Sequence, residues 1–409
     1  MAGKIKIGEI DQNIMNILHT VQFYHPSVGG AQEVVRQVSE QLVKRGHQVT
    51  VATTYSPRRN VHTINGVQIE EFNISGSSAS GFQGDTQRYI DFILDSKFDV
   101  MMNYAAQQWA SDLIFPVLDR IPFTKVFIPC GFSGLYSPQF SSYFQQMPDV
   151  LRRYDHLVFH ASAYRDIEFA RQHKIDHFSL IPNGASEREF GENDTTFRRQ
   201  YQIPEGEPLL LTVSSHFALK GHRLIIETFR RARIGKATLV LIGNTLGIPG
   251  CLPKCRLHAQ LVKGMSLGKK KVLLLDPPRR TVIEAYHAAD LFLLGSRVEY
   301  SPLVLFEAMA SKTPIITSAC GNAEEIIRWS RSGVVVAPEQ KKSDGTIRTD
   351  AGKMARAIEE LNFDRMRRQQ LATAGYEAWI ERFTWEKIAI QYEELYLRLI
   401  KRHSSSVAK

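Results

Sequence analysis

The sequence has few cysteines and no long apolar run, and both absences narrow what the chain can be. It contains four cysteines in 409 residues, namely Cys130, Cys251, Cys255 and Cys320. That is too sparse for a secreted domain held by disulfides. No apolar stretch approaches the roughly 20 residues that cross a bilayer. The first twelve residues lack the apolar centre of a signal peptide. We therefore expect a cytoplasmic chain.

Signatures of metal and nucleic-acid binding are also missing. Cys251, Cys255 and His258 resemble half of a metal site, but a second ligand pair is absent from the sequence nearby and Pro253 separates the cysteines. We interpret them as a reduced loop and expect no metal. The net charge is +9, yet no zinc-finger or RNA-recognition pattern accompanies it. A solvated basic surface is the preferred interpretation, membrane contact the second and nucleic-acid binding the third.

The order of apolar runs indicates two α/β domains. The chain is longer than one core ordinarily supports. Short apolar runs alternate with amphipathic stretches, as in parallel sheets. The alternation pauses at the polar stretch 191–208, which predicts a linker. The expected strands are 15–21, 48–53, 66–74, 99–103, 125–128, 156–160 and 178–181 before the linker, and 209–213, 238–242, 272–275, 291–294, 315–317 and 334–336 after it.

The predicted organisation ends in a long helix. Apolar residues recur at helical spacing over 385–402, and charged residues occupy the opposite face, so this helix is expected to pack against another surface. The tail 403–409 is expected to be disordered. We predict an N-terminal Rossmann-like domain over 1–190 and a second one over 209–384.

The first candidate motif follows the first expected strand. Gly29 and Gly30 open a helix expected over 30–45, and residues this small let backbone amides approach an anion at a helix N-terminus. The Gly-x-Gly-x-x-Gly dinucleotide fingerprint is absent from this turn. A tight strand-to-helix turn that binds nothing is the alternative interpretation.

The second candidate is Lys220, which stands between an expected strand and helix of the second half. That position lies beyond the carboxyl end of a strand, where open α/β sheets bind ligands. A cation is unfavourable at a helix N-terminus, which argues for an anionic ligand such as a phosphate. A solvated surface lysine is the alternative.

Two glutamates form the third candidate motif. Glu299 follows the strand expected at 291–294, and Glu307 lies within an otherwise apolar helix start. A carboxylate in apolar surroundings needs hydrogen-bond donors. Ribose hydroxyls are suitable donors, and a buried ion pair or a cap to a neighbouring loop is the alternative. At the same helix N-terminus, Leu303 and Val304 offer backbone N–H groups to a diphosphate, and Pro302 suits the first turn.

In this order the motifs resemble those of the family-4 retaining glycosyltransferases, and the likeness covers nearly the whole chain. It implies an α/β GT-B fold of two Rossmann-like, doubly wound domains that face each other across a cleft, with the last helix crossing back to the N-terminal domain. The matching segments are 23–36, 45–51, Ile181-Pro182-Asn183-Gly184, Lys220-Gly221, Glu299 and Glu307 with seven residues between them, and Phe383-Thr384-Trp385-Glu386.

The resemblance implies a retaining glycosyltransferase that moves a hexosyl group from a nucleotide-diphosphate sugar to a hydroxyl acceptor, in cell-surface polysaccharide or glycolipid synthesis. Lys220 and Glu299 would be catalytic, with Lys220 at the diphosphate and Glu299 at the donor sugar. Glu307 would hold the ribose, and the amides of Leu303 and Val304 would bind the diphosphate. No cofactor or metal is implied, because the nucleotide sugar is itself the substrate.

The glycine turn and one further loop complete the implied donor site. Gly29 and Gly30 would approach the donor phosphates or the acceptor, and the loop 277–282 would contact the base. The acceptor can be lipid-linked, with peripheral contact at the inner face of the membrane. A sugar-nucleotide epimerase or phosphorylase of the same architecture, or a non-catalytic sugar-nucleotide-binding protein, is the alternative to a transferase.

Three places depart from the family's pattern. An arginine is frequent five residues before the phosphate lysine, where this chain has Ser215 followed by His216. We assign both residues to the donor site by position. A histidine is common where Asn103 and Tyr104 stand, and we assign these two tentatively to the acceptor. Cys130-Gly131 stands where a histidine-glycine pair is frequent.

Overall fold

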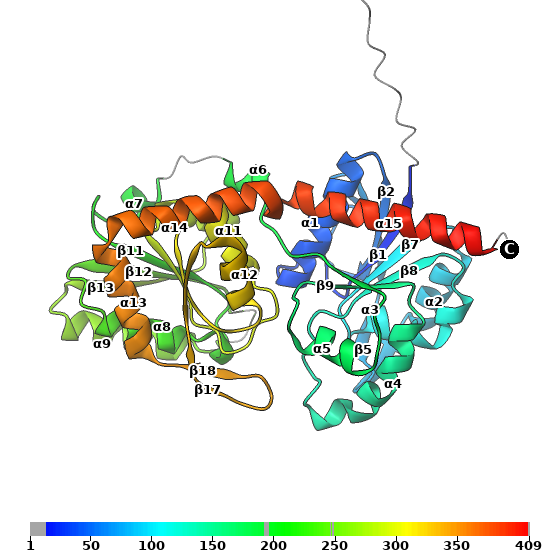
Figure 1. Ribbon diagram of the computed structural model, residues 1–409, viewed down its shortest axis with the longest axis horizontal. Coiled ribbons are helices and arrows are strands. Elements are labelled where there is room, and N and C mark those ends of the chain that lie inside the picture. Colours follow the sequence, from blue (N-terminus) through cyan, green and yellow to red (C-terminus); the bar gives the residue numbers. More distant parts are fainter. Residues whose placement is uncertain (1–13, 192–195, 246, 248, 408–409) are drawn as a thin grey trace, which may run out of the picture. The chain divides into compact units, whose positions relative to one another are not determined.

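The computed structural model describes residues 14–191, 196–245, 247 and 249–407 (Figure 1). Contacts within the chain divide it into two units. The first comprises residues 1–129, 142–157 and 393–409, and the second comprises 130–141 and 158–392. The predicted linker 191–208 thus falls within the second unit, although residues 192–195 lie outside the described residues. Residues 1–12, which lack the apolar centre of a signal peptide, also lie outside the described residues.

The first unit contains most of a largely parallel sheet of order β10-β9-β8-β7-β1-β2-β4-β3, of which β10 and the last two residues of β9 fall in the second unit. Strand β1 is central, and Ile17 pairs with Val49 of β2 on one side and Val100 of β7 on the other. Each predicted strand before the linker has a counterpart, while β3 and a hairpin of β5 and β6 were not predicted. The strands are β1 Asn16–Thr20, β2 Gln48–Thr54, β3 Thr63–Ile64, β4 Val67–Phe72, β5 Ile74–Ser77, β6 Gly81–Gly84, β7 Val100–Tyr104, β8 Thr124–Ile128, β9 His156–Phe159 and β10 Phe178–Leu180.

The first helix of the part of the chain before β11 is α1, which buries Val34, Val38 and Leu42 as its apolar spacing predicts. The helices are α1 Gly30–Lys44, α2 Thr86–Asp95, α3 Trp109–Asp112, α4 Ser141–Arg152, α5 Arg165–Gln172, α6 Glu187–Phe190 and α7 Phe197–Gln200.

The last helix, α15 (Trp385–Val407), begins where the sequence predicts but does not end there. Residues 403–407 are helical, so the expectation of a disordered tail from 403 is wrong for them. His403 Nε2 lies 3.1 Å from the carbonyl oxygen of Pro122, and the Ser404 and Ser405 hydroxyls donate to carbonyls one turn earlier. These bonds extend the helix by one turn.

The second unit has a parallel six-stranded sheet of order β13-β12-β11-β14-β15-β16. From β11 the chain first adds strands on one side and then returns to add β14, β15 and β16 on the other. The switch point of this doubly wound sheet therefore lies between β11 and β14. The strands are β11 Leu209–Val213, β12 Ala237–Ile242, β13 Lys270–Leu275, β14 Leu291–Leu294, β15 Ile315–Ser318, β16 Gly333–Val336, and an unpredicted hairpin of β17 Pro338–Lys341 and β18 Ile347–Thr349.

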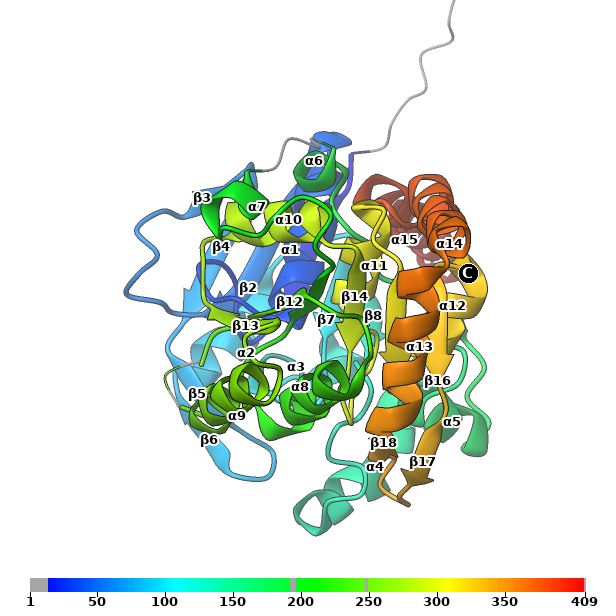
Figure 2. The same ribbon diagram turned by 90° about the vertical axis from the view of Figure 1, so that its left-hand side faces the viewer.

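Helices cover both faces of this sheet (Figure 2). One apolar cluster joins the strands to α8, α9 and α13, and the other joins them to α10, α11 and α12. Among the described helices, none combines the length and the apolarity needed to span a bilayer. The helices are α8 His222–Arg231, α9 Leu252–Met265, α10 Arg279–Ala288, α11 Leu303–Ala310, α12 Ala323–Ser330, α13 Ala351–Phe363 and α14 Arg365–Ala378.

Candidate functional site

Two of the predicted site residues meet at the switch point of the second sheet. Lys220 ends the 3-10 turn after β11, and Glu299 lies in the loop after β14. The Lys220 ammonium donates to Glu299 Oε1 over 2.7 Å, although the residues are 79 positions apart in sequence. Their side chains are 30% and 14% exposed, so the pair remains within reach of a ligand.

Close backbone packing holds the Lys220 turn against the end of β14. Gly221 has φ +73°, and a Cβ on it would lie 1.8 Å from the carbonyl oxygen of Gly295. The N–H of Arg297 donates to the carbonyl of Leu219 over 2.8 Å. Only glycine fits such a position, so the turn that carries Lys220 is tightly located in the fold.

The N-terminus of α11 opens next to Glu299 in sequence. Pro302 is the N-cap, and within the described part of the chain no side chain caps this helix. The first N–H groups of a helix have no intrahelical acceptor, and together with the helix dipole they favour an anion. Leu303 and Val304, half-buried at this end, thus supply the backbone donors that the sequence predicts there.

Glu307 is buried and pairs with Arg279, whose side chain is 41% exposed. Arg279, the first residue of α10, donates to Glu307 Oε1 over 2.6 Å and to Glu189 Oε2 over 2.7 Å. Burial alone lowers the pKa of Arg279, but the two carboxylates outweigh it and raise that pKa above its ordinary value. The ion pair is the alternative that the sequence left open. Sequence reasoning missed Arg279, although a buried glutamate requires such a partner.

A cluster of buried polar residues anchors the loop that contains Glu299. The Tyr300 hydroxyl accepts the N–H of His160 over 2.9 Å, and Asn183 donates to the carbonyl of Ser301 over 3.1 Å. The N–H of Gly131 donates to Asp166 over 2.7 Å, and burial raises the pKa of Asp166 to about 6, although a hydrogen bond with Tyr300 opposes the shift. Segments far apart in sequence therefore fix the position of this loop.

The side chain of His216, which we assign to the donor site by position, is buried, and its donor role stays a prediction. Its side chain is 2% exposed and faces His222 and Cys251, with Nδ1 3.1 Å from His222 Nδ1. The turn after β11 is short and packs against α8, which leaves the imidazole inside. Ser215 is partly exposed, and its donor role stays a prediction. The nearby Arg297 is engaged elsewhere. Its Nε donates to the carbonyl of Ile347 in β18.

Gly29 and Gly30 lie at the N-terminus of α1 in the first unit. Gly29 has φ 174°, an extended conformation open to any residue. Among the described residues, a Cβ on Gly30 would meet no atom within 4 Å, and one on Gly29 would meet only the flexible end of Gln32. Neither backbone strain nor packing within the unit therefore requires glycine at position 30.

The tentative assignment of Asn103 and Tyr104 to the acceptor is not supported. Both are buried in β7, and the Asn103 amide donates to Thr20 over 2.7 Å and accepts from Tyr154 over 3.0 Å. The strand is central in a parallel sheet, where both faces are covered. These two side chains pack the core of the first unit.

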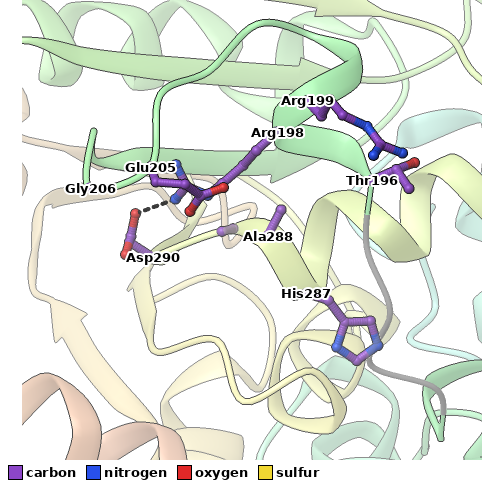
Figure 3. Close-up of a pocket in the computed structure, with 9 residues that line it drawn as sticks. Thr196, Arg198, Arg199, Glu205, Gly206, His287, Ala288 and Asp290 are labelled. Atoms are coloured by element: carbon purple, nitrogen blue, oxygen red, sulfur yellow. Dashed lines mark hydrogen bonds and ion pairs between the residues drawn. The ribbon is translucent and has the colours of Figure 1, made fainter.

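A cavity of about 660 Å³ lies elsewhere in the second unit (Figure 3). It includes Glu205, Gly206 and Asp290, which precede β11 and β14, so it lies at the amino ends of the strands. Ligands bind open α/β sheets at the carboxyl ends. Arg198, which lines the cavity, donates to Asp290 over 2.9 Å, and this surface is therefore not the predicted donor site.

Comparison with known proteins identifies the architecture. N-acetyl-alpha-D-glucosaminyl L-malate synthase of Bacillus anthracis is 24% identical over 393 residues, which cover 92% of this chain and 96% of that protein. Sucrose-phosphate synthase of Thermosynechococcus elongatus superposes with a TM-score of 0.74 at 20% identity, covering 95% and 100% of the two chains. Anabaena HepE in complex with UDP-glucose superposes with a TM-score of 0.68 at 14% identity, covering 96% and 99%.

Two Rossmann-like sheets in one chain, with these structural neighbours, define a GT-B fold, as the sequence predicts. Residues 193–377, in the second half of the chain, match the family of glycosyl transferases group 1. The chain is therefore a glycosyltransferase that takes its sugar from a nucleotide-sugar donor.

Proposed function

We propose that this glycosyltransferase moves a hexosyl group from a nucleoside-diphosphate sugar to a hydroxyl acceptor with retention of anomeric configuration, as family-4 enzymes do. The observation that carries the proposal is the 2.7 Å pair of Lys220 and Glu299 at the switch point of the second sheet. One side chain suits a phosphate and the other suits sugar hydroxyls, and both stand where such sheets bind ligands.

Charge stabilisation of the leaving diphosphate falls to Lys220 and α11 in this proposal. The departing phosphate gains negative charge as the glycosidic bond breaks, and fixed donors aimed at that charge lower the barrier. Lys220 supplies a full positive charge, and the amides of Leu303 and Val304 supply the helix N-terminus. No metal at the diphosphate is required. Ser215, partly exposed on the same turn, adds a neutral donor where the pattern of the family-4 enzymes often has an arginine.

Glu307 holds the ribose in this proposal while it stays paired with Arg279. A carboxylate offers about four acceptor positions on its two oxygens, and the short contact of Arg279 is made to Oε1. The other acceptor positions suit the hydroxyls of a ribose. Arg279 also lies in the segment 277–282, which we propose contacts the base; the sequence predicts a loop there, but from residue 279 the segment is the first turn of α10.

The acceptor is proposed as a hydroxyl compound, with a lipid-linked saccharide of cell-surface polysaccharide or glycolipid synthesis as the first candidate. The net charge of +9 suits peripheral attraction to an anionic membrane surface. In the first unit, Gly29 and Gly30 leave the N-terminus of α1 open to a ligand, since a Cβ at Gly30 would meet nothing within 4 Å among the described residues.

A donor panel tests this function. The purified chain is incubated with nucleoside-diphosphate hexoses, with and without sugar and lipid-linked acceptors, and nucleotide release is measured. Retained anomeric configuration is read from the proton coupling of the product's anomeric carbon by NMR. We expect release that depends on the acceptor and a product of the donor's own configuration. The Glu307→Gln variant should raise the KM for the donor about tenfold, a typical effect of one lost hydrogen bond to a charged group.

Four results would contradict the proposal in whole or in part. Donor conversion without any acceptor would indicate an epimerase, and phosphate-dependent cleavage would indicate a phosphorylase. Nucleotide-sugar binding without turnover across the panel would indicate a binding protein. An inverted product would overturn the retaining mechanism while leaving the transferase class intact.

A further inference from the structure

We propose that His216, His222, Cys251 and Cys255 form a structural zinc site that ties the turn after β11 to the start of α9. Their ligand atoms all lie within 4.8 Å of one another. All four residues belong to the second unit, and the set contains two imidazoles and two thiols. Two histidines and two cysteines are a donor set that zinc takes in closed, four-coordinate structural sites.

Three of the separations between the ligand atoms are close to those of a zinc tetrahedron, and all of them are within 4.8 Å. His222 Nδ1 lies 3.1 Å from His216 Nδ1 and 3.3 Å from Cys251 Sγ, and His216 Nδ1 lies 3.7 Å from the same sulfur. With zinc–nitrogen bonds of about 2.0–2.1 Å and zinc–sulfur bonds of about 2.3 Å, the ligand atoms of a tetrahedron lie roughly 3.3–3.8 Å apart. Small adjustments of rotamers suffice to place an ion at the centre.

Local backbone structure brings the two cysteines to the histidines. Cys251 is the N-cap of α9 and Cys255 lies one turn later, so both sulfurs share a helix face. The N–H of Cys251 donates to the carbonyl of His216 over 3.0 Å. A Cβ on Gly250 would lie 1.7 Å from that same carbonyl oxygen, so a side chain there would force the two segments apart. Helices α8 and α9 lie side by side (Figure 2).

The surroundings suit a bound cation. His216, His222 and Cys255 are each at most 2% exposed, which closes the site to substrate and makes a structural role the appropriate one. Ser214 Oγ lies 2.7 Å from His222 Nε2, which orients that ring as outer partners of metal-bound histidines do.

The sequence showed only half of this arrangement. Cys251 and Cys255 were interpreted as a reduced loop because Pro253 separates them and no second ligand pair follows. In the structure Pro253 is in the first turn of α9, where proline is tolerated, and it keeps the cysteines one turn apart. The missing pair lies earlier in the chain, at 216 and 222. His258, the histidine nearest in sequence, is outside the group.

Metal analysis of the intact chain tests the site. The protein is produced with zinc and a reductant, passed through gel filtration, and its metal content is measured by mass spectrometry. We expect about one zinc ion per chain. The Cys255→Ser and His222→Gln variants should each lose at least about tenfold in zinc affinity. Matched controls are Cys320→Ser, another buried cysteine of this unit, and His258→Gln, another histidine of α9, and both should keep the ion.

Cobalt substitution keeps the test decisive if a ligand variant fails to fold. Co²⁺ is titrated into the reduced, chelator-treated wild-type chain, and the visible spectrum is recorded. Tetrahedral bands with thiolate-to-cobalt charge transfer, displaced by added zinc, support the site. A chain that carries no zinc and shows no such bands overturns it, as does equal loss of zinc in the control and ligand variants. None of these readouts depends on glycosyl transfer.

Discussion

The turn after β1 and the turn after β11 occupy equivalent places in their sheets, yet they use glycine for different reasons. In the second unit, Gly221 is required by packing, because a Cβ would collide with the Gly295 carbonyl at 1.8 Å. In the first unit, a Cβ on Gly30 would meet nothing within 4 Å among the described residues. One glycine serves the fold, and the other has no structural requirement within its own unit.

The charges differ between the two turns as well. The second turn carries Lys220, paired with Glu299, while the first has no charged residue between Pro26 and Ala31. A charged group held in a rigid turn is suited to stabilising a developing charge, whereas an uncharged helix N-terminus offers only backbone donors. We therefore expect the second unit to stabilise the developing negative charge. Three substitutions test this expectation.

Loss of Lys220 should have the largest effect. Lys220→Ala removes the one cation that we assign to the diphosphate, and single groups of this kind contribute roughly 10²–10³ in kcat. We expect a fall of that size in kcat/KM for the donor, with the melting temperature little changed, because a partly exposed ion pair adds about 0–1 kcal/mol. Steady-state kinetics and thermal melting measure the two quantities.

A second lysine of the same unit provides the control. Lys236 pairs with Glu207 over 3.4 Å and its side chain is 68% exposed, so Lys236→Ala should leave kcat/KM unchanged. Equal activity of the Lys220→Ala and wild-type chains would remove Lys220 from the mechanism. The Lys220→Arg variant should recover part of the loss, because it restores charge but not the compact ammonium.

The sequence predicted the positions of helices and strands more accurately than the contacts between side chains. The strands at 209–213 and 291–294 were predicted to the residue, because buried parallel strands read as continuous apolar runs. The meeting of Lys220 and Glu299 was expected only through family resemblance. Arg279 beside Glu307, and His216 beside Cys251, depend on loop paths that no local pattern specifies. The helix at 403–407 was missed because its carbonyl and hydroxyl partners carry no apolar signal.

The second substitution, Gly221→Ala, should lower stability more than any change at Gly30. The methyl group meets a backbone carbonyl rather than a flexible side chain, and the residue has a positive φ that alanine adopts poorly. Overpacking of this kind costs about 1–3 kcal/mol, so we expect a clearly lower melting temperature. Activity should fall too, because the Lys220 turn moves. A variant as stable as wild type would show that the turn relaxes freely and would weaken the contrast with the first unit.

The smallest effect is expected at Gly30. If a ligand approaches this turn, Gly30→Ala should lower kcat/KM about tenfold, equal to about 1.4 kcal/mol, and Gly30→Leu should lower it further. Stability should hold or rise, because alanine favours helix over glycine by up to about 1 kcal/mol. Gly264, a helical glycine of α9 whose Cβ would likewise meet no described atom within 4 Å, is the matched control, and Gly264→Ala should leave kinetics unchanged. Full activity in both Gly30 variants would make the first turn a structural connection only, and the two glycines would then differ in packing but not in function.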